Sequence, residues 1–383
     1  MTPEFSCFGA NPTPVKEITM AAYGQQLPRT MKAVITYGPQ DYRMEELPVP
    51  QAGPGEVVVK VDHAGVCASD MKCYFGAHHF WGDGSRVGYC QPPITAGHEF
   101  AGEVVQLGEG ASEAYGLSIG DMAVSEQIIP CGQCRYCLTG KYWVCQKHEI
   151  YGFRQSAPGA MAEYMKFPAG ARNYKLPEGM SRAHAALVEP LACSIHAVQR
   201  ANIQFGDVVV IAGAGTLGLG MVAVAKLANP AMVIAVDPKD YRLTVASKLG
   251  ADLTINPDKE DVVARVRELT GGYGCDVYID ATGYPESVLP GLLMLRKLGT
   301  FVEYGVFRES ATVDWTIIGD MKEMNIHGAH LAPYTFPLAI DYISRGLVDV
   351  TPIVTHELPL EEFGRALRMV HEATESIKVL LRP

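Results

Sequence analysis

The sequence lacks the features that mark several protein classes. No apolar run among its 383 residues approaches the ~18 residues needed to cross a bilayer, and no basic segment followed by an apolar one begins the chain. Charged residues make up only 19%, against 48% apolar residues, which excludes a disordered, solvating chain. Basic residues (32) are outnumbered by acidic ones (42), and the net charge of −10 repels a phosphate backbone. These absences predict a compact cytoplasmic protein that binds neither membrane nor nucleic acid.

The chain is long enough for two to three domains. Residues 1–30 carry four prolines and no sustained period, so we expect an extension that is weakly ordered or docked on the surface. Residues 31–192 show short β-runs broken by turns, typical of an irregular β-barrel domain. Residues 193–333 alternate strands with helical segments, which predicts a doubly wound parallel sheet. Residues 334–383 end in an apolar helix face and the strand-like IKVLLRP, which we expect to return to the first domain.

Ten cysteines are the compositional feature that needs an explanation. In a secreted chain an even number would suggest disulfides, whereas cytosolic thiols more often bind metal, perform chemistry or fill core space. The spacing of the cysteines decides between these uses.

Four of them cluster in CGQCRYCLTGKYWVC, at Cys131, Cys134, Cys137 and Cys145. Thiolates at gaps of two, two and seven residues can close a tetrahedron around one zinc and leave no position open to substrate. The nearest rival is an iron–sulfur run, but its bacterial spacing has three residues before the fourth cysteine and a proline after it, whereas Gln146 follows here. Two disulfides are disfavoured in a reducing compartment. The pattern predicts a structural zinc lobe over about residues 127–148.

A glycine-rich turn follows the candidate strand 207–212 and opens an apolar helix. It consists of Gly213, Ala214, Gly215, Thr216, Leu217 and Gly218. Glycines at these spacings permit a tight turn, close approach of the backbone to a pyrophosphate, and close packing of helix on strand. The alternative is a glycine cluster needed only for packing.

Asp237 ends the next candidate strand, 19 residues after Gly218. A carboxylate there can accept hydrogen bonds from the adenosine ribose of NAD and would repel the 2′-phosphate of NADP. Lys239 and Arg242 lie close by and could favour NADP instead, and Arg242 is included among the candidate cofactor contacts. The alternative for Asp237 is an ordinary residue at a strand end.

A third group is dispersed along the chain. Cys67 lies in GVCASD, His98 and Glu99 lie in GHE, and Glu189 lies in VEPLACSIH. Each is unremarkable alone, as a core cysteine, a satisfied histidine or a carboxylate near a helix start. Together they offer a sulfur, an imidazole and carboxylate oxygens, which can hold a zinc that keeps an open position.

With these motifs in this order, residues 31–383 resemble the zinc-containing medium-chain dehydrogenases. The resemblance implies a Rossmann domain and a GroES-like β-barrel catalytic domain, one catalytic and one structural zinc per subunit, and NAD. The segment EPLACSIH is similar to the sorbitol-type polyol branch, and the chain is most similar to the group that oxidises erythritol and L-threitol, two four-carbon polyols.

The resemblance also assigns roles to single residues. Cys67, His98 and Glu99 are implied as zinc neighbours, with water and Glu189 exchanging at the remaining position; the alternative places Glu99 beside the zinc without ligating it. Ser69 is implied as the first member of a proton relay. The same resemblance implies that Thr282 and Gly305 line the nicotinamide pocket, and that the chain forms a homodimer or homotetramer.

An enlarged aromatic segment separates Cys67 from His98, which stand 31 positions apart. Tyr74, Phe80 and Trp81 are candidates for a wall that limits substrate length. A surface or subunit-contact loop is the alternative.

Three functions are compatible with these motifs. The first is zinc-dependent oxidation of a secondary hydroxyl of a four-carbon polyol by NAD, which yields a ketotetrose. The second keeps the chemistry but acts on a longer polyol, a sugar or an amino alcohol such as threonine. The third is a zinc-stapled binding protein without turnover, which the presence of Cys67, His98, Glu99 and Glu189 disfavours.

Overall fold

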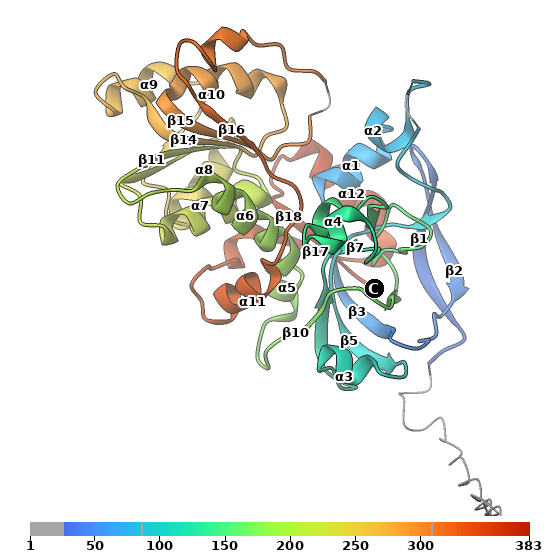
Figure 1. Cartoon of the computed structure of the whole chain (residues 1–383). Coiled ribbons are helices and arrows are strands. Elements are labelled where there is room, and N and C mark those ends of the chain that lie inside the picture. Colours follow the sequence, from blue (N-terminus) through green and yellow to red (C-terminus); the bar gives the residue numbers. More distant parts are fainter. Residues whose placement is uncertain (1–26, 86, 308) are drawn as a thin grey trace, which may run out of the picture.

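The computed structural model describes residues 27–85, 87–307 and 309–383. The predicted N-terminal extension therefore lies, up to residue 26, outside the described residues. Two units stand side by side, one built around a β-barrel and one around a parallel sheet (Figure 1). Within the described residues, no helix has the length and apolar content required to span a membrane.

The strands of the barrel unit pair antiparallel except for one parallel pair at the edge of its main sheet, and its central strands are largely buried. Its main sheet has the order β10 (Asn173–Lys175), β6 (Met122–Ser125), β5 (Glu99–Leu107), β3 (Val57–Val66), β18 (Lys378–Arg382) and β17 (Val354–Pro359), with β9 (Tyr164–Phe167) on β3. Smaller sheets join β2 (Asp41–Pro48), β1 (Thr30–Gly38) and β4 (Ile94–Thr95), and pair β7 (Ile128–Ile129) with β8 (Glu149–Ile150). Each strand predicted for this unit is present, with ends shifted by a few residues.

Most helices of the barrel unit are short, with α12 (Phe363–Glu372) the longest. They are α1 (Ala68–Tyr74), α2 (His78–Trp81), α3 (Ala111–Tyr115), α4 (Arg135–Leu138), α5 (Arg182–Ala185) and α12 (Phe363–Glu372), with 3-10 turns η2 (Tyr142–Val144), η5 (Thr351–Ile353) and η6 (Leu360–Glu362). The C-terminal strand β18 pairs antiparallel with β3 of the barrel.

The second unit is a six-stranded parallel sheet, as predicted. Its order is β13 (Leu253–Ile255), β12 (Met232–Val236), β11 (Val208–Ala212), β14 (Cys275–Asp280), β15 (Leu295–Glu303) and β16 (Asn325–Gly328). Its helices are α6 (Val188–Ala201), α7 (Thr216–Leu227), α8 (Asp240–Lys248), α9 (Val262–Leu269), α10 (Val288–Met294) and α11 (Phe336–Ser344), with 3-10 turns η3 (Pro285–Ser287) and η4 (Trp315–Ile317). Chain order reverses on either side of β11, which creates a crevice at the carboxyl ends of the strands.

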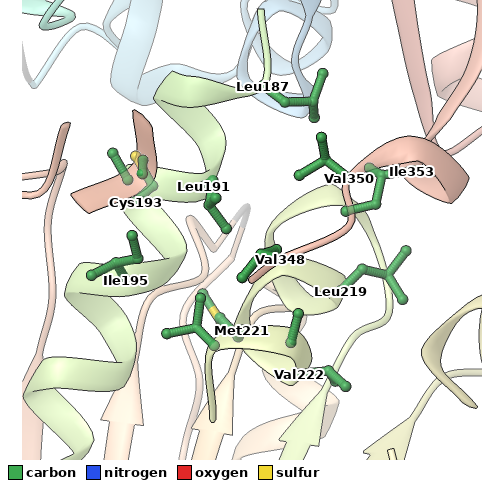
Figure 2. Packing of buried hydrophobic residues seen from close by; sticks show 14 of the residues in the cluster. Leu187, Leu191, Cys193, Ile195, Leu219, Met221, Val222, Val348, Val350 and Ile353 are labelled. Carbon is green, nitrogen blue, oxygen red and sulfur yellow. The ribbon is translucent and has the colours of Figure 1, made fainter. Parts of the chain in front are cut away.

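The core of the second unit reaches beyond the predicted limits 193 and 333. Leu191 and Ile195 of α6 belong to one buried cluster with Leu219 of α7 and with Val348 and Val350, as Figure 2 shows. The apolar face of α6 begins at residue 188, and α11 packs on α6. The helices at both boundaries therefore share the hydrophobic core of the parallel sheet.

Candidate active site

Three of the four predicted catalytic-zinc ligands, Cys67, His98 and Glu99, lie together at one edge of the barrel. Ligand atoms of Cys67, His98 and Glu99 all lie within 4.8 Å of one another. The reason is the antiparallel pairing of β3 with β5, in which Gly65 stands opposite Glu99. The end of one strand and the start of the other therefore coincide, and residues 31 positions apart become neighbours.

An ion-pair contact and a hydrogen bond hold the His98 ring. Its Nδ1 lies 3.3 Å from Oδ1 of Asp70, and its Nε2 lies 3.3 Å from Oγ of Ser69. The second oxygen of Asp70 accepts the backbone N–H of Cys67, at 2.9 Å. Burial lowers the pKa of His98, but Asp70 and the Cys67 sulfur outweigh it and hold that pKa well above its usual range. A carboxylate on one ring nitrogen is the usual support for a histidine whose other nitrogen binds metal.

Glu99 is buried and paired. Its Oε2 lies 2.5 Å from Nζ of Lys378, which also donates to the carbonyl of Val66, and both side chains are almost fully buried. A Cβ at position 65 would lie 2.1 Å from the same carboxylate oxygen, so only glycine leaves room for it. The ion pair satisfies one oxygen of Glu99.

Glu189 faces this group from α6 but does not belong to it. It lies in the first turn of the helix and is 7% exposed. Burial and the neighbouring Glu99 raise the pKa of Glu189 to about 7, against the opposing effects of His98 and Lys378. The structure therefore brings together three of the four predicted ligands and sets the fourth beside them.

The four cysteines of the lobe also converge. Their sulfurs lie within 4.8 Å of one another, and those of Cys131 and Cys137 are 4.0 Å apart, near the ~3.8 Å edge of a tetrahedron with Zn–S bonds of about 2.3 Å. Backbone N–H groups of Cys137 and Gln146 donate to the Cys134 sulfur and lower the pKa of Cys134 to about 6. The thiolate form that a metal requires is therefore favoured.

The glycine-rich turn lies between β11 and α7. A Cβ at Gly218 would lie 1.6 Å from the carbonyl oxygen of Gly213, whereas a Cβ at Gly215 would meet no atom within 4 Å. Gly218 therefore serves close packing and Gly215 leaves the backbone open to a ligand. Asp237, at the tip of β12, accepts the backbone N–H of Ala214 at 2.8 Å and so borders this turn.

Other residues predicted at the cofactor crevice have partners of their own. The Arg242 guanidinium lies 3.8 Å from Asp237 and hydrogen bonds the hydroxyl of Tyr241. The hydroxyl of Thr216 donates to the carbonyl of Ile377, and the carbonyl of Leu217 accepts the hydroxyl of Ser194.

Thr282 and Gly305 lie at the carboxyl ends of β14 and β15. The Thr282 hydroxyl donates to Asp280 at 2.8 Å. A Cβ at Gly305 would lie 2.3 Å from the backbone nitrogen of Gly283, so the two turns touch. Both lie at the edge where parallel sheets of this topology bind ligands.

The alcohol dehydrogenase GroES-like domain matches residues 53–178, and the zinc-binding dehydrogenase model matches residues 216–345. The chain belongs to the zinc-binding dehydrogenase family. This confirms the expected family and fold, a GroES-like barrel joined to a Rossmann sheet.

Relatives in the family are similar over nearly the whole chain. An erythritol/L-threitol dehydrogenase of Mycolicibacterium smegmatis is 50% identical over 358 residues, which cover 94% of this chain and 99% of that protein. An L-threonine 3-dehydrogenase of Bacillus velezensis is 35% identical over 343 residues, covering 89% and 95%. A solved structure from Sinorhizobium meliloti 1021, described as a zinc-binding dehydrogenase and bound to NADP, superposes with a TM-score of 0.82 at 27% identity, covering 92% of this chain and 99% of that one.

Asp70 and Lys378 are features of this dehydrogenase site that sequence reasoning missed. A signal for Asp70 was present, because a carboxylate three residues after a helix N-cap forms a capping box, and Cys67 with Asp70 does so. A signal for Lys378 was a charge inside the apolar run of residues 377–381, IKVLL.

The aromatic segment divides between two places. Phe80 of α2 stacks on Phe153, whose ring lies 5.3 Å from that of His98. Tyr74 instead packs edge-on against Tyr42, and the Trp81 indole donates to the carbonyl of Cys73. Of the three candidates, Phe80 is the one with a ring contact to Phe153, and through it to His98.

Proposed function

We propose that this dehydrogenase oxidises a secondary hydroxyl of a four-carbon polyol, erythritol or L-threitol, to a ketotetrose and transfers the hydride to NAD. Zinc-dependent oxidation is supported by one observation, the largely buried group of sulfur, imidazole and carboxylate ligands at Cys67, His98 and Glu99. The choice of polyol is supported by the relative named for erythritol and L-threitol, which is 50% identical over 94% of the chain.

Two zinc ions per subunit fit the two ligand groups. Cys67, His98 and Glu99 would hold the catalytic ion with Glu189 beside it, and the four lobe cysteines would hold a structural one. A zinc with an open position lowers the pKa of a bound hydroxyl, which allows an alkoxide near neutral pH. The donor chemistry supports this, because Asp70 presents the His98 ring and backbone amides favour the Cys134 thiolate.

Protein groups around the ligand cluster would move the proton. The Ser69 hydroxyl, 3.3 Å from Nε2 of His98, is positioned to take the first proton of the alcohol. Glu189 is the acceptor we favour, since Glu99 is already paired with Lys378.

NAD is favoured over NADP by Asp237. Its carboxylate borders the turn at Gly213 and Gly215, where it would accept from a ribose and repel a 2′-phosphate. Arg242 is held by Tyr241 and Ser376, which limits its use for a phosphate. Thr282 and Gly305 would line the nicotinamide side.

A homodimer or homotetramer is supported by the free edge of the parallel sheet. Among the residues that the structure describes, strand β16 pairs with β15 alone, and Ile326 of β16 and Leu298 of β15 are exposed apolar side chains. An exposed strand edge with apolar neighbours is a template for pairing with a second copy. Location in the cytoplasm is supported by the lobe cysteines, which bind metal only when reduced.

Threonine-type oxidation is the second candidate, favoured by the 35% identical L-threonine 3-dehydrogenase. Initial rates of NADH formation on erythritol, L-threitol, D-threitol, sorbitol and threonine separate the two. We expect the highest kcat/KM for a tetritol; equal or better turnover of sorbitol or threonine would overturn the four-carbon assignment.

The site itself is tested by Cys67→Ser, with bound zinc counted in each preparation. We expect NADH formation to be lost while circular dichroism stays unchanged. Cys275→Ala, which alters a buried cysteine in the core of the parallel sheet, is the matched control and should keep its turnover.

A further inference from the structure

Cys193 lies one helical turn after Glu189 on α6, in a polar setting that its apolar sequence context does not suggest. Residues four apart on a helix share a face. The Cys193 thiol donates to Oε1 of Glu189 at 3.4 Å, and its side chain is buried. The cysteine therefore supplies a hydrogen-bond donor to a buried carboxylate.

The thiol is itself held from the barrel unit. Nε2 of Gln127 donates to the Cys193 sulfur at 3.4 Å. Gln127 lies between β6 and β7 and is 1% exposed. A thiol can accept and donate a hydrogen bond at once, so the three side chains form a chain from amide to thiol to carboxylate.

A third element closes the network from the parallel sheet. The partly buried Tyr304 follows β15; its hydroxyl lies against the Cys193 thiol and donates to the carbonyl of Leu331 at 3.0 Å. Gln127, Cys193 and Tyr304 thus come from the barrel, from α6 and from the Rossmann sheet. The environment of one thiol depends on both units.

Among the described residues, the Cys193 thiol is the one hydrogen-bond donor to the Glu189 carboxylate. Its charged neighbours include Glu99, which repels it, and Lys378, which is already paired with Glu99. Without the thiol, this buried carboxylate would have no hydrogen-bond donor among the described residues.

We propose that Cys193, held by Gln127, is a positioning residue that orients the Glu189 carboxylate toward the ligand cluster at Cys67. The inference rests on the proposed function, since it assigns Glu189 a part in the dehydrogenation. It goes beyond that function by naming side chains that set the position of Glu189.

Substitutions at residue 193 separate a positioning role from a packing role. Cys193→Ser keeps a donor, whereas Cys193→Ala removes it at similar volume. We expect Cys193→Ala to lower kcat about three- to tenfold, as loss of one ordinary hydrogen bond implies, with KM for NAD and bound zinc unchanged. Ser should stay within about twofold of the wild type. If Ser is as impaired as Ala, or Ala retains full kcat, the proposal is overturned.

The link to Gln127 is tested by a double-mutant cycle. Gln127→Met removes the amide donor while keeping a chain of similar length. Its effect on kcat should match that of Cys193→Ala, and the double variant should be no worse than either single one. Additive losses would show that the two side chains act independently. Cys275→Ala is again the control and should leave kcat unchanged.

A readout that does not need turnover distinguishes this proposal from the proposed function. Cobalt(II) can replace zinc, and its visible absorption responds to groups around the metal. We expect the bands of cobalt at the Cys67 site to shift in Cys193→Ala but not in Cys193→Ser. Identical spectra in all three proteins overturn the positioning role even if the enzyme oxidises tetritols. Shifted spectra in a protein that oxidises no polyol support the positioning role and refute the proposed substrate.

Discussion

Replacing Lys378 by methionine should be among the most destabilising single changes in the barrel unit. The Lys378 ammonium is 2.5 Å from the Glu99 carboxylate, and each side chain is 2% exposed. Removing one partner leaves the other charge buried and unpaired, which costs about 3–5 kcal/mol in proteins. A bound metal cation beside Glu99 offsets part of this cost, so we expect the upper end of the range in metal-free protein and the lower end in zinc-loaded protein.

Equilibrium urea unfolding of both forms measures the effect. Lys378→Met combined with Glu99→Gln should recover most of the lost stability, because no buried charge then remains. The control is Lys175→Met, which breaks an ion pair with Asp121 at 2.8 Å in which the lysine is 47% exposed, and which should cost less than about 1 kcal/mol. The reasoning is refuted if Lys378→Met costs no more than this control, or if the double variant is no more stable than the single one.

Three further predictions concern the lobe, the cofactor and pH. Cys134→Ser should reduce bound zinc from two ions to one per chain and lower the thermal midpoint by several degrees, as metal analysis and calorimetry would show; a change in turnover alone would contradict a structural role. Asp237→Ser should reduce the kcat/KM preference for NAD over NADP about tenfold, and an unchanged ratio would exclude the ribose contact. Burial and Asp280 raise the pKa of Glu303 from 4.5 to about 7, so its stabilising contribution is complete below pH 4.5 and lost as the pH rises through 7. Glu303→Gln should therefore be more stable than the wild type at pH 8, by about 1 kcal/mol after solvent screening of this half-buried side chain, but not at pH 4. Urea unfolding at the two pH values measures the difference, and an equal effect of the substitution at both would contradict the prediction.

Local patterns predicted the parts of the fold that depend on neighbouring residues. Strand and helix periods gave the barrel and the parallel sheet, and the glycine turn before α7 lies where its spacing places it. The domain limits were harder to predict from the sequence, because the buried faces of α6 and α11 join a core whose other members are far away in the sequence.

The amino-acid sequence by itself determined the chemistry that short spacings encode. The sulfurs of Cys131, Cys134, Cys137 and Cys145 converge because a few backbone turns connect them. Nearby residues have few ways to arrange themselves, so spacing alone carries the information.

Only the tertiary structure decided how the Cys67 site is supported. Lys378 reaches Glu99 across 279 positions because β18 pairs with β3, and Gln127 reaches Cys193 because the barrel closes on α6. Such contacts join side chains that share no pattern in the sequence, since strand pairing and burial bring them together only when the whole chain is folded.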